Sequence, residues 1–342
     1  MGVAITDLLK GKELSFEELN NKVLAVDAFN MLYQFLTTIR MSDGTPLKDS
    51  KGNITSHLIG LFNRTTTLMS KGLKLVFVFD GEAPLLKKVE RERRNKVKAN
   101  ALMKLKEAEQ REDIDAMKKY SGRTARLDSE MIEEAKQLLS ALGLPVIQAL
   151  SEGEGQAAHL VKKGDAYAVV SQDADSFLFG AQRVIRNLNL SGRRKKTNTL
   201  AYEKVLPELL ELKTTLNELK LTLDQLIVLS ILVGTDYNRE GIKGIGPKKA
   251  LKLLERHGEH FDELFEEVKW QDNYDFSWKE ILKIFKELPV TNDYELKWSS
   301  VNESKVKELL VEKHDFSNER IIASLKKLKT EGMKQKGLGE FF

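Results

Sequence analysis

The sequence predicts an α/β fold with a mostly parallel central sheet and helices on both of its faces. Apolar runs typical of buried strands alternate with helical patterns from the start of the 342-residue chain, an order that favours parallel strands joined by helices. Several of these runs end at acidic residues, and the carboxyl ends of parallel strands meet at one edge of a sheet. Cys is absent, so neither disulfides nor a thiolate zinc site is possible.

The first quarter of the chain contains two clear strand signals, each followed by a helical pattern. Val23–Asp27 and Leu75–Asp80 are apolar runs that end in Asp, and both predict buried strands. Helical patterns lie near Asn30–Met41 and Ile54–Lys71. Between them, Ser42–Asn53 is polar and contains two Gly turn signals, which predicts a loop.

The next segment, Leu85–Lys119, is helical in pattern, strongly charged and poor in large apolar residues. We therefore expect its helices to stand away from the core. From Lys87 to Arg126 there are fourteen basic and seven acidic residues, a net charge of +7, whereas the whole chain has +4. A local basic excess beside acidic strand ends fits a polyanionic substrate that also needs metal ions.

The rest of the chain continues the alternation and then becomes mainly helical. Asp128 or Ser129 is expected to cap a helix over Met131–Leu142, with Gly143 at its end. The further expected elements are a strand over Pro145–Gln148, a helix over Gly155–Lys163, strands over Tyr167–Ser171 and Val184–Asn187, an exposed basic hairpin over Ser191–Leu200, a helix over Leu221–Val233, a Gly-rich turn over Gly241–Gly246, and mainly helices from Pro247 to Lys329.

No apolar run approaches the length of a membrane span, and the N-terminus lacks a signal-peptide pattern. We therefore expect an intracellular protein without membrane contact.

Seven acidic residues carry the strongest functional signal, because each follows an apolar run or begins the next element. Gathered at one edge, they would repel one another unless cations lay between them. Oxygen ligands without His or Cys suit Mg²⁺ or Mn²⁺. Any one acid alone could be a helix cap or a turn former, but two acid-x-acid pairs after strands favour metal binding. The candidate metal ligands are Asp27, Asp80, Glu152, Glu154, Asp173, Asp175 and Asp236.

Basic and aromatic residues add candidate substrate contacts. Lys87 and Arg94 are seven residues apart on one helix face near Asp80 and could polarise a scissile phosphate, or could belong to a solvated face. Tyr33 could stack on a base or pack in the core. The amides near Gly244 and Gly246, with Lys248 and Lys249, could hold a DNA phosphate, although an ordinary helix–helix turn would share this pattern.

The C-terminus places Gln335, Leu338, Phe341 and Phe342 after a polar spacer over Thr330–Lys334. Exposed apolar groups there favour an extended segment that docks on a partner. The alternative is a frayed tail that packs on its own domain.

Together these motifs resemble the structure-specific flap endonucleases of archaea and eukaryotes, and the resemblance runs in order along the whole chain. It is carried by Met1-Gly2-Val3, Val26-Asp27-Ala28, Val78-Phe79-Asp80-Gly81, Ser151-Glu152-Gly153-Glu154, Ser171-Gln172-Asp173-Ala174-Asp175, Val233-Gly234-Thr235-Asp236-Tyr237 and Gly241–Ala250.

The resemblance implies an enzyme that cuts DNA bearing a 5′ flap near the junction, with 5′–3′ exonuclease activity, in replication and repair. It implies two Mg²⁺ per active site, with Mn²⁺ as a substitute, held by the seven acids. Lys87 and Arg94 match the basic pair at the base of a helical arch over Leu85–Arg126, and Tyr33 matches an aromatic that stacks near the cleavage point. Gly241–Ala250 matches a helix-hairpin-helix that grips duplex DNA, with K⁺ bound.

Further DNA contacts and a partner are implied in the same way. Ser42–Ser56 and the Phe316–Arg320 region resemble the parts that wedge the junction and hold a one-nucleotide 3′ flap. The further implied DNA-binding residues are Gly2, Thr55 and Arg320. Gln335–Phe342 resembles the motif that docks on the sliding clamp (PCNA), and a monomer is expected. The expected regions are a nuclease domain over 1–329, made of an N-terminal region 1–128 with the arch over 85–126, an internal region 129–257 and a helical part 258–329, and a flexible tail over 330–342.

Three positions depart from the family pattern. Leu150 replaces a proline, Gly155 replaces an alanine, and Ala174 replaces a larger residue. None removes a carboxylate, and Gly155 is expected to weaken the helix start by about 1 kcal/mol. The chain ends at the clamp motif without a basic tail, as expected for an archaeal-type protein without nuclear import.

Rival functions remain open on the sequence. A 5′ exonuclease or a bubble-cutting repair nuclease would share the carboxylates, and an RNA-processing nuclease could share the sheet. A non-catalytic DNA-binding adaptor that recruits the clamp is the binding-protein alternative.

Overall fold

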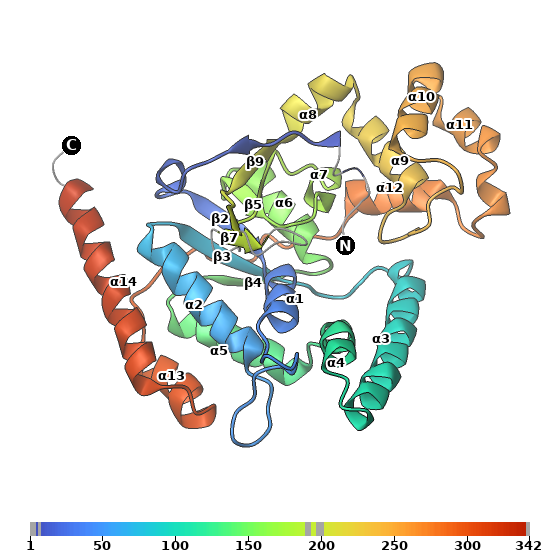
Figure 1. Cartoon of the computed structure of the whole chain (residues 1–342). Helices are drawn as coiled ribbons and strands as arrows, with labels where there is room; N and C mark the ends of the chain where they lie inside the picture. The colour runs from blue at the N-terminus through green and yellow to red at the C-terminus, as the bar shows by residue number, and fades with distance from the viewer. Residues whose placement is uncertain (1–4, 6–7, 189–192, 196–201, 340–342) are drawn as a thin grey trace.

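A seven-stranded mixed sheet forms the centre of the molecule, with helices on both faces (Figure 1). This computed structural model describes residues 5, 8–188, 193–195 and 202–339. The strand order is β1-β9-β6-β5-β2-β3-β4, in which β2 to β6 run parallel and β9 and β1 are antiparallel to their neighbours. The strands are β1 (Lys12–Glu13), β2 (Val23–Asp27), β3 (Lys74–Phe79), β4 (Val146–Gln148), β5 (Ala168–Val170), β6 (Arg183–Arg186) and β9 (Glu208–Glu211).

The prediction of a mostly parallel sheet is confirmed, but β1 and β9 were missed. Both are short, β1 is the edge strand and β9 lies between it and β6, and only pairing with residues far away in the chain defines them. The expected basic hairpin is present in part: β7 (Arg193–Lys195) pairs with β8 (Tyr202–Lys204), and residues 196–201 lie outside the described part of the chain.

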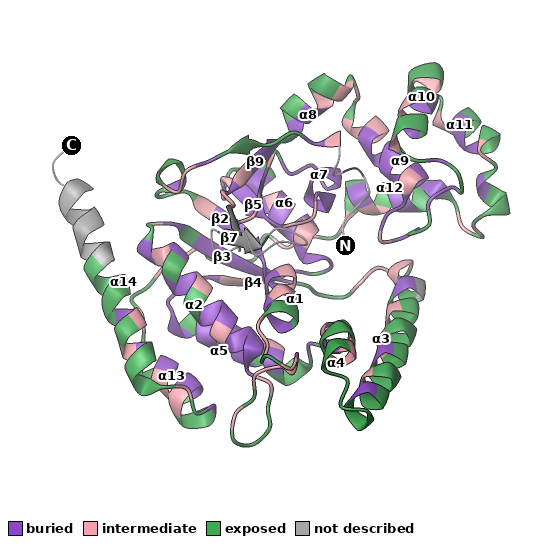
Figure 2. Cartoon of the chain, in the orientation of Figure 1, coloured by how far each residue is buried: buried purple, intermediate pink, exposed green. Residues whose placement is uncertain are grey.

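Alternate residues of the central strands pack into two separate cores. On β2, Leu24 and Val26 belong to one core and Ala25 to the other, and on β3 Val76 and Val78 lie on the same side as Ala25. Both faces of the sheet are buried, as Figure 2 shows for the central strands, so these strands consist of continuous apolar runs.

The helices cover the two faces of the sheet and extend to one side of it (Figure 1). Helices α1, α2, α5 and α14 pack on one another along one face, and α6 packs on β2 and β3 from the other. The helices are α1 (Ala28–Thr38), α2 (Ser56–Ser70), α3 (Lys87–Gln110), α4 (Ile114–Ser121), α5 (Ser129–Ala141), α6 (Gly153–Lys163), α7 (Asp175–Leu178), α8 (Leu212–Leu219), α9 (Leu223–Val233), α10 (Pro247–His257), α11 (Phe261–Glu267), α12 (Trp278–Glu287), α13 (Glu303–Lys307) and α14 (Asn318–Gly339).

Local sequence explains several helix boundaries. The Asp128 carboxylate accepts a hydrogen bond from the Met131 amide at 2.8 Å, so Asp128, rather than Ser129, caps α5. Thr222 and Gln225 form a capping box at the start of α9. At Gly155, the Leu288 side chain fills the space that a Cβ would need, so the glycine there serves packing and an alanine would displace Leu288.

Helices α3 and α4 stand apart from the sheet and pack mainly on each other (Figure 1). Figure 2 shows that most of their surface is exposed. Their buried apolar residues include the small side chains Ala101 and Ala108, which agrees with a segment poor in large apolar residues.

The expectation of mainly helices from Pro247 to Lys329 is confirmed, with the exception of residues 288–302, which contain no helix. This segment runs extended along the body, where its Trp298 indole donates to the Leu75 carbonyl at 2.9 Å and Thr291 exchanges two hydrogen bonds with Gln156. Pro289 and the β-branched and Asx residues near it have low helix propensity, and distant partners satisfy their backbone.

Helix α14 continues to Gly339, although we expected the helical part to end at residue 329. The added residues 330–339 include the good helix formers Glu331, Met333, Lys334, Gln335 and Lys336. The helix continues through Gly332 and Gly337 although glycine has a low helix propensity. Residues 340–342 lie outside the described part of the chain.

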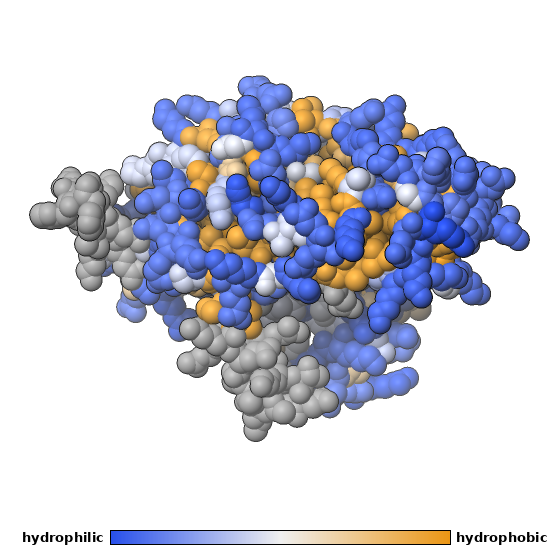
Figure 3. Space-filling view, turned by 90° about the horizontal axis from the view of Figure 1, so that it is seen from above, coloured by the Kyte–Doolittle hydropathy of each residue, from blue (hydrophilic) through white to orange (hydrophobic). Residues whose placement is uncertain are grey.

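The face seen from above is mostly hydrophilic, with hydrophobic residues visible between the hydrophilic ones (Figure 3). Among the described residues, no helix has both the length and the apolar content that a membrane span requires.

Candidate active site

The sheet topology brings the acidic strand ends together. Asp27 is the last residue of β2, which lies between β3 and β5. Asp80 directly follows β3, and Asp173 follows β5 by three residues. The chain proceeds from β2 through β3 to β4 and then returns to the other side of β2, so the strand order reverses here, and open α/β sheets bind ligands at such a point.

The Glu152-Gly153-Glu154 motif begins α6 beside Asp80. The Gly153 amide donates to Asp80 Oδ1 at 2.7 Å, and a Cβ at residue 153 would lie 2.7 Å from the same oxygen. A larger residue at position 153 would therefore displace the Asp80 carboxylate. Glu152 is buried at the N-cap of the helix, and Glu154 lies in its first turn.

The remaining acids join the same group of side chains. Asp175 is buried at the start of α7, and Asp173 accepts a hydrogen bond from the Asn30 side chain at 3.1 Å. Asp236 follows α9 after Gly234, whose φ of +121° and close contact with the Arg239 carbonyl exclude other residues. Electrostatic interactions connect all seven predicted ligands directly or through Lys87. We call these seven residues the acidic cluster.

Three members of the acidic cluster have raised pKa values. Burial, followed by the charges of Asp80 and Asp173, raises the pKa of Asp27 to about 7. Burial also raises the pKa of Asp80, and burial with the charges of Asp175, Asp27 and Asp173 raises that of Glu154 well above its ordinary value. The protein groups alone therefore leave negative charge uncompensated at this edge of the sheet.

Lys87 and Arg94 extend from the base of α3 to the acidic cluster. Lys87 Nζ lies 2.6 Å from Glu152 Oε1 and 3.3 Å from Asp236 Oδ2, and an Arg94 terminal nitrogen donates to Asp236 Oδ1 at 2.8 Å. Burial by itself lowers the pKa of Lys87, but the two carboxylates outweigh it and the net shift is upward. Burial likewise raises the pKa of Asp236, but Lys87 and Arg94 reverse the direction.

The acidic cluster fits hard divalent cations by its chemistry, because its donors are all carboxylate oxygens and its charge exceeds that of Lys87 and Arg94. In the part of the chain that the structure describes, no group of three or more Asp, Glu or His side chains is already arranged to hold one ion. Protein donors contact these oxygens instead: Lys87 and Tyr237 donate to Glu152, Gly153 to Asp80 and Asn30 to Asp173. Metal binding therefore requires the carboxylates to exchange some of these donors for the ion.

The other predicted contact residues lie outside the acidic cluster. Tyr33 is half-buried on α1, with Lys98 Nζ of α3 5.2 Å from its ring centre. Between α9 and α10, Gly244 has a φ of +80°, and nothing lies within 4 Å of a Cβ built at Gly244 or Gly246. Lys248 and Lys249 are exposed on α10.

The loop over Ser42–Ser56 contacts the residues directly before Phe316–Arg320, the other segment expected to hold a 3′ flap. Ser50 donates to Asp315 from its amide at 2.9 Å, and His314 contacts Asp49 at 2.8 Å. Arg320 is exposed nearby on α14. Thr55 was predicted to contact DNA but is only 3% exposed, because its amide bonds to the Leu47 carbonyl and folds the loop over it. In this conformation the Thr55 side chain is therefore not accessible to DNA.

The predicted tail contacts fall at the end of α14. Gln335 and Leu338 lie on this helix, while Phe341, Phe342 and Gly2 are outside the described residues.

Sequence reasoning missed the residues that hold the acids in place. The Tyr237 hydroxyl donates to Glu152 Oε2 at 2.8 Å, and Asn30 bonds to Asp173. Tyr237 directly follows Asp236 in the recognised motif and Asn30 comes three residues after Asp27, so proximity to a predicted ligand was the available signal.

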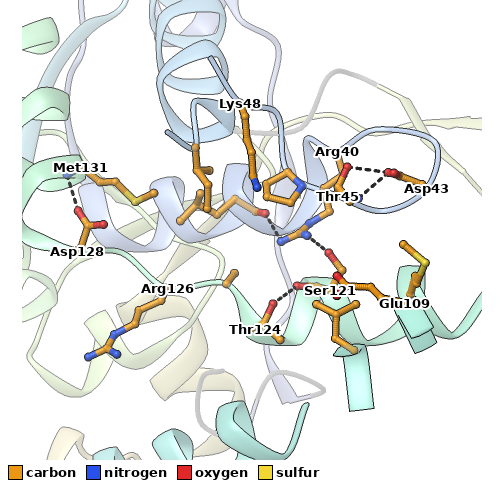
Figure 4. Close-up of a pocket in the computed structure, with 16 residues that line it drawn as sticks. Arg40, Asp43, Thr45, Lys48, Glu109, Ser121, Thr124, Arg126, Asp128 and Met131 are labelled. Carbon is orange, nitrogen blue, oxygen red and sulfur yellow. Dashed lines mark hydrogen bonds between the residues drawn. The ribbon is translucent and has the colours of Figure 1, made fainter. Parts of the chain in front are cut away.

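A cavity of about 390 Å³ lies where the end of α4 meets the loop after α1 (Figure 4). Arg40 bonds there to Ser121 and, at 2.9 Å, to the Gly44 carbonyl. No member of the acidic cluster lines this cavity. The residues around this cavity connect the end of α4 to the loop after α1.

A cluster of carboxylates at the switch point of a sheet, with basic side chains from a protruding helix beside it, is the arrangement expected of a metal-dependent nuclease. A family model described as the XPG N-terminal domain matches residues 1–101, and another described as the XPG I-region matches residues 143–236. Flap endonuclease 1 of Hyperthermus butylicus is 48% identical over 334 residues, which cover 96% of this chain and 94% of that protein. The chain belongs to the flap endonuclease 1 family.

Solved structures agree with this assignment. Flap endonuclease-1 from Methanococcus jannaschii matches 98% of this chain and 100% of that chain, with a TM-score of 0.76 and 40% identity. The catalytic core of Rad2 in complex with DNA substrate matches 96% of this chain and 100% of that chain, with a TM-score of 0.71 and 25% identity. The family resemblance inferred from the motifs is confirmed.

Proposed function

We propose that this chain cuts DNA with a 5′ single-stranded flap near the junction, using two Mg²⁺ held by the acidic cluster. Its family membership makes it a 5′ flap endonuclease, a hydrolase of DNA replication and repair. The proposal depends above all on one observation: the seven acids form one interacting cluster at the edge of the sheet, with Lys87 and Arg94 paired to two of them. Its site of action would be intracellular, at replication and repair intermediates, as a monomer.

The acidic cluster and the residues around it would have different roles in cleavage. Bound Mg²⁺, or Mn²⁺ in its place, would supply a water of lowered pKa and positive charge at the leaving oxygen. Lys87 and Arg94 would turn from Asp236 and Glu152 to the scissile phosphate and offset its developing charge. Tyr237 and Asn30 hold Glu152 and Asp173 in orientation.

DNA binding would depend on shape rather than base sequence. The open amides at Gly244 and Gly246, with Lys248 and Lys249, offer a phosphate site on the duplex, and the proposed K⁺ belongs to the same turn. Tyr33 would stack on a base near the cleavage point. The 5′ strand would pass beside α3 and α4, where the charge is +7 from Lys87 to Arg126.

A comparison of three labelled DNA substrates tests the function. With Mg²⁺, a 5′-flap duplex should be cut near the junction faster than a blunt duplex or a bubble, and EDTA should stop the reaction. Preferred cutting of the bubble would indicate a repair nuclease, and preferred degradation of the blunt duplex a 5′ exonuclease. Binding without any Mg²⁺-dependent cleavage would leave the adaptor alternative.

The raised pKa of Asp27 predicts how pH and Mg²⁺ affect stability. Without metal, the folded protein keeps a proton on Asp27 up to a pKa of about 7, while the unfolded chain releases it near 3.8. Stability should therefore fall as pH rises through this window. Mg²⁺ should restore more of the Tm at about pH 8 than at about pH 5.5, because protons no longer compete with the ion. Calorimetry at both pH values measures this difference.

The Asp27→Asn variant is the matched control, since its side chain does not titrate. The part of the pH dependence that comes from Asp27 should disappear in this variant. An equal Mg²⁺ effect at both pH values in the native protein would contradict the assignment of cations to this crevice.

The proposed clamp contact predicts a selective loss. Changing Phe341→Ala together with Phe342→Ala should leave cleavage of free flaps unchanged but remove stimulation by the sliding clamp, because apolar anchors dominate such contacts. Lys334→Ala, in the polar spacer, serves as the control and should keep the stimulation. Full stimulation of the double variant would refute the tail proposal.

A further inference from the structure

Glu90 is a buried acid on α3 that none of the roles above uses. It is 7% exposed, whereas its neighbours Arg91 and Glu92 are exposed. Its carboxylate accepts hydrogen bonds from Arg93 at 2.7 and 2.9 Å, from Arg94 at 2.8 Å and from Arg239 at 3.0 Å. Three guanidinium groups carry more positive charge than one carboxylate needs for neutralisation. This arrangement fits a role of Glu90 in orienting these arginines.

Arg94 is fixed from two sides by this arrangement. Its Nε donates to Glu90 Oε1 and a terminal nitrogen donates to Asp236 Oδ1, both at 2.8 Å. A guanidinium group is planar, so a bond at Nε sets the direction of the terminal nitrogens. Glu90 thus directs the terminal nitrogens of Arg94 toward Asp236 in the acidic cluster.

Arg239 connects the same carboxylate to a second element. It lies three residues after Asp236 in the loop that follows α9, and it donates to the Oε1 atom of Glu90 that also accepts from Arg94. The base of α3 is therefore attached to the Asp236 loop twice, by Arg94 to Asp236 and by Arg239 to Glu90. Side chains 142 and 149 residues apart in sequence meet here.

We propose that Glu90 is a positioning residue for cleavage: it orients Arg94 toward the scissile phosphate and, through Arg239, sets the base of the helical arch against the Asp236 loop. The inference rests on the proposed role of Arg94. The hydrogen bonds described for the Glu90 carboxylate come from arginines and not from members of the acidic cluster. Its effect would pass entirely through the two arginines.

Single-turnover cleavage of a 5′-flap duplex with saturating enzyme and Mg²⁺ tests the proposal. Glu90→Gln keeps the size of the side chain but removes its charge, and the rate should fall about 10- to 100-fold, as expected for a misplaced catalytic group. Binding of the flap DNA should change less than about threefold, because the phosphate contacts elsewhere remain. Glu92→Gln, an exposed acid on the same helix, should cut at the native rate.

A double-mutant cycle separates positioning from general structural damage. If Glu90 acts through Arg94, adding Glu90→Gln to Arg94→Ala should change the rate less than about twofold further. If the rate of the double variant falls by the product of the two single-variant losses, the proposal is overturned. Arg239→Gln leaves the buried acid in place and should slow cleavage about threefold or more, with little further effect in the Glu90→Gln background.

The outcomes also distinguish this inference from the proposed function. If the native protein does not cut flap DNA with Mg²⁺, the function fails. If the native protein cuts, Arg94→Ala is impaired and Glu90→Gln cuts at the native rate, only the positioning role fails.

Discussion

Replacing Asp173 by alanine should abolish cleavage of flap DNA while leaving flap binding within about tenfold of native, because a positioned metal supplies several kcal/mol of transition-state stabilisation that DNA binding does not use. Asp173 lies beyond the end of β5, next to Asp27 at the switch point, and the Asn30 side chain orients it at 3.1 Å. Single-turnover rates in Mg²⁺ and a parallel binding titration measure the two quantities.

Asp165 provides a matched control at the opposite end of the same strand. It precedes β5 and bonds to the Tyr294 hydroxyl at 2.6 Å, away from the acidic cluster. Asp165→Ala should keep cleavage near the native rate. Normal cleavage by Asp173→Ala would refute the site, and an equal loss in Asp165→Ala would indicate a general effect on the fold.

Replacing Lys87 by alanine should lower the rate of cleavage by about 10²- to 10³-fold, as expected when a group that stabilises charge in the transition state is removed. The same change should not weaken Mg²⁺ binding. Lys87 neutralises Glu152 and Asp236, so its loss makes the crevice more negative and should increase the rise in Tm that Mg²⁺ produces. The metal-free variant should be less stable, because the buried Glu152 loses its charged partner.

Lys88→Ala is the control for this experiment, since Lys88 is exposed on the same turn of α3. It should cleave at a rate close to native and show the native response to Mg²⁺. Weaker Mg²⁺ binding in Lys87→Ala would contradict the proposed role, because it would place the lysine among the groups that support the ion.

Much of the site could be read from the sequence because its signals are local. Asp27 and Asp80 follow apolar runs whose length and composition identify buried strands, and parallel strands deliver their ends to one edge. The Glu152-Gly153-Glu154 motif was found the same way, but the 2.7 Å bond from the Gly153 amide to Asp80 appears only in the structure. The position of Thr55 was harder to predict, because a loop folded by the Leu47 carbonyl buries it.

Long-range contacts account for the features that were missed. β9 exists as a strand through pairing with β6, and residues 288–302 stay extended through bonds to Gln156, Leu75 and Gly143. Tyr237 reaches Glu152 across 85 residues, and Arg239 reaches Glu90 across 149. Sequence periodicity cannot identify such partners, because only the folded structure brings them together.

By itself, the sequence determined the five parallel strands, the approximate bounds of several helices, the seven acids and the family motifs, because short-range sterics, capping and hydrophobic periodicity encode them within a few residues. Only the tertiary structure decided the strand order around β2, the pairing of Lys87 with Glu152 and Asp236, and the Glu90 contacts. These contacts depend on the packing of two cores on opposite faces of one sheet. Residues from distant parts of the chain contribute to that packing, so no short segment determines it.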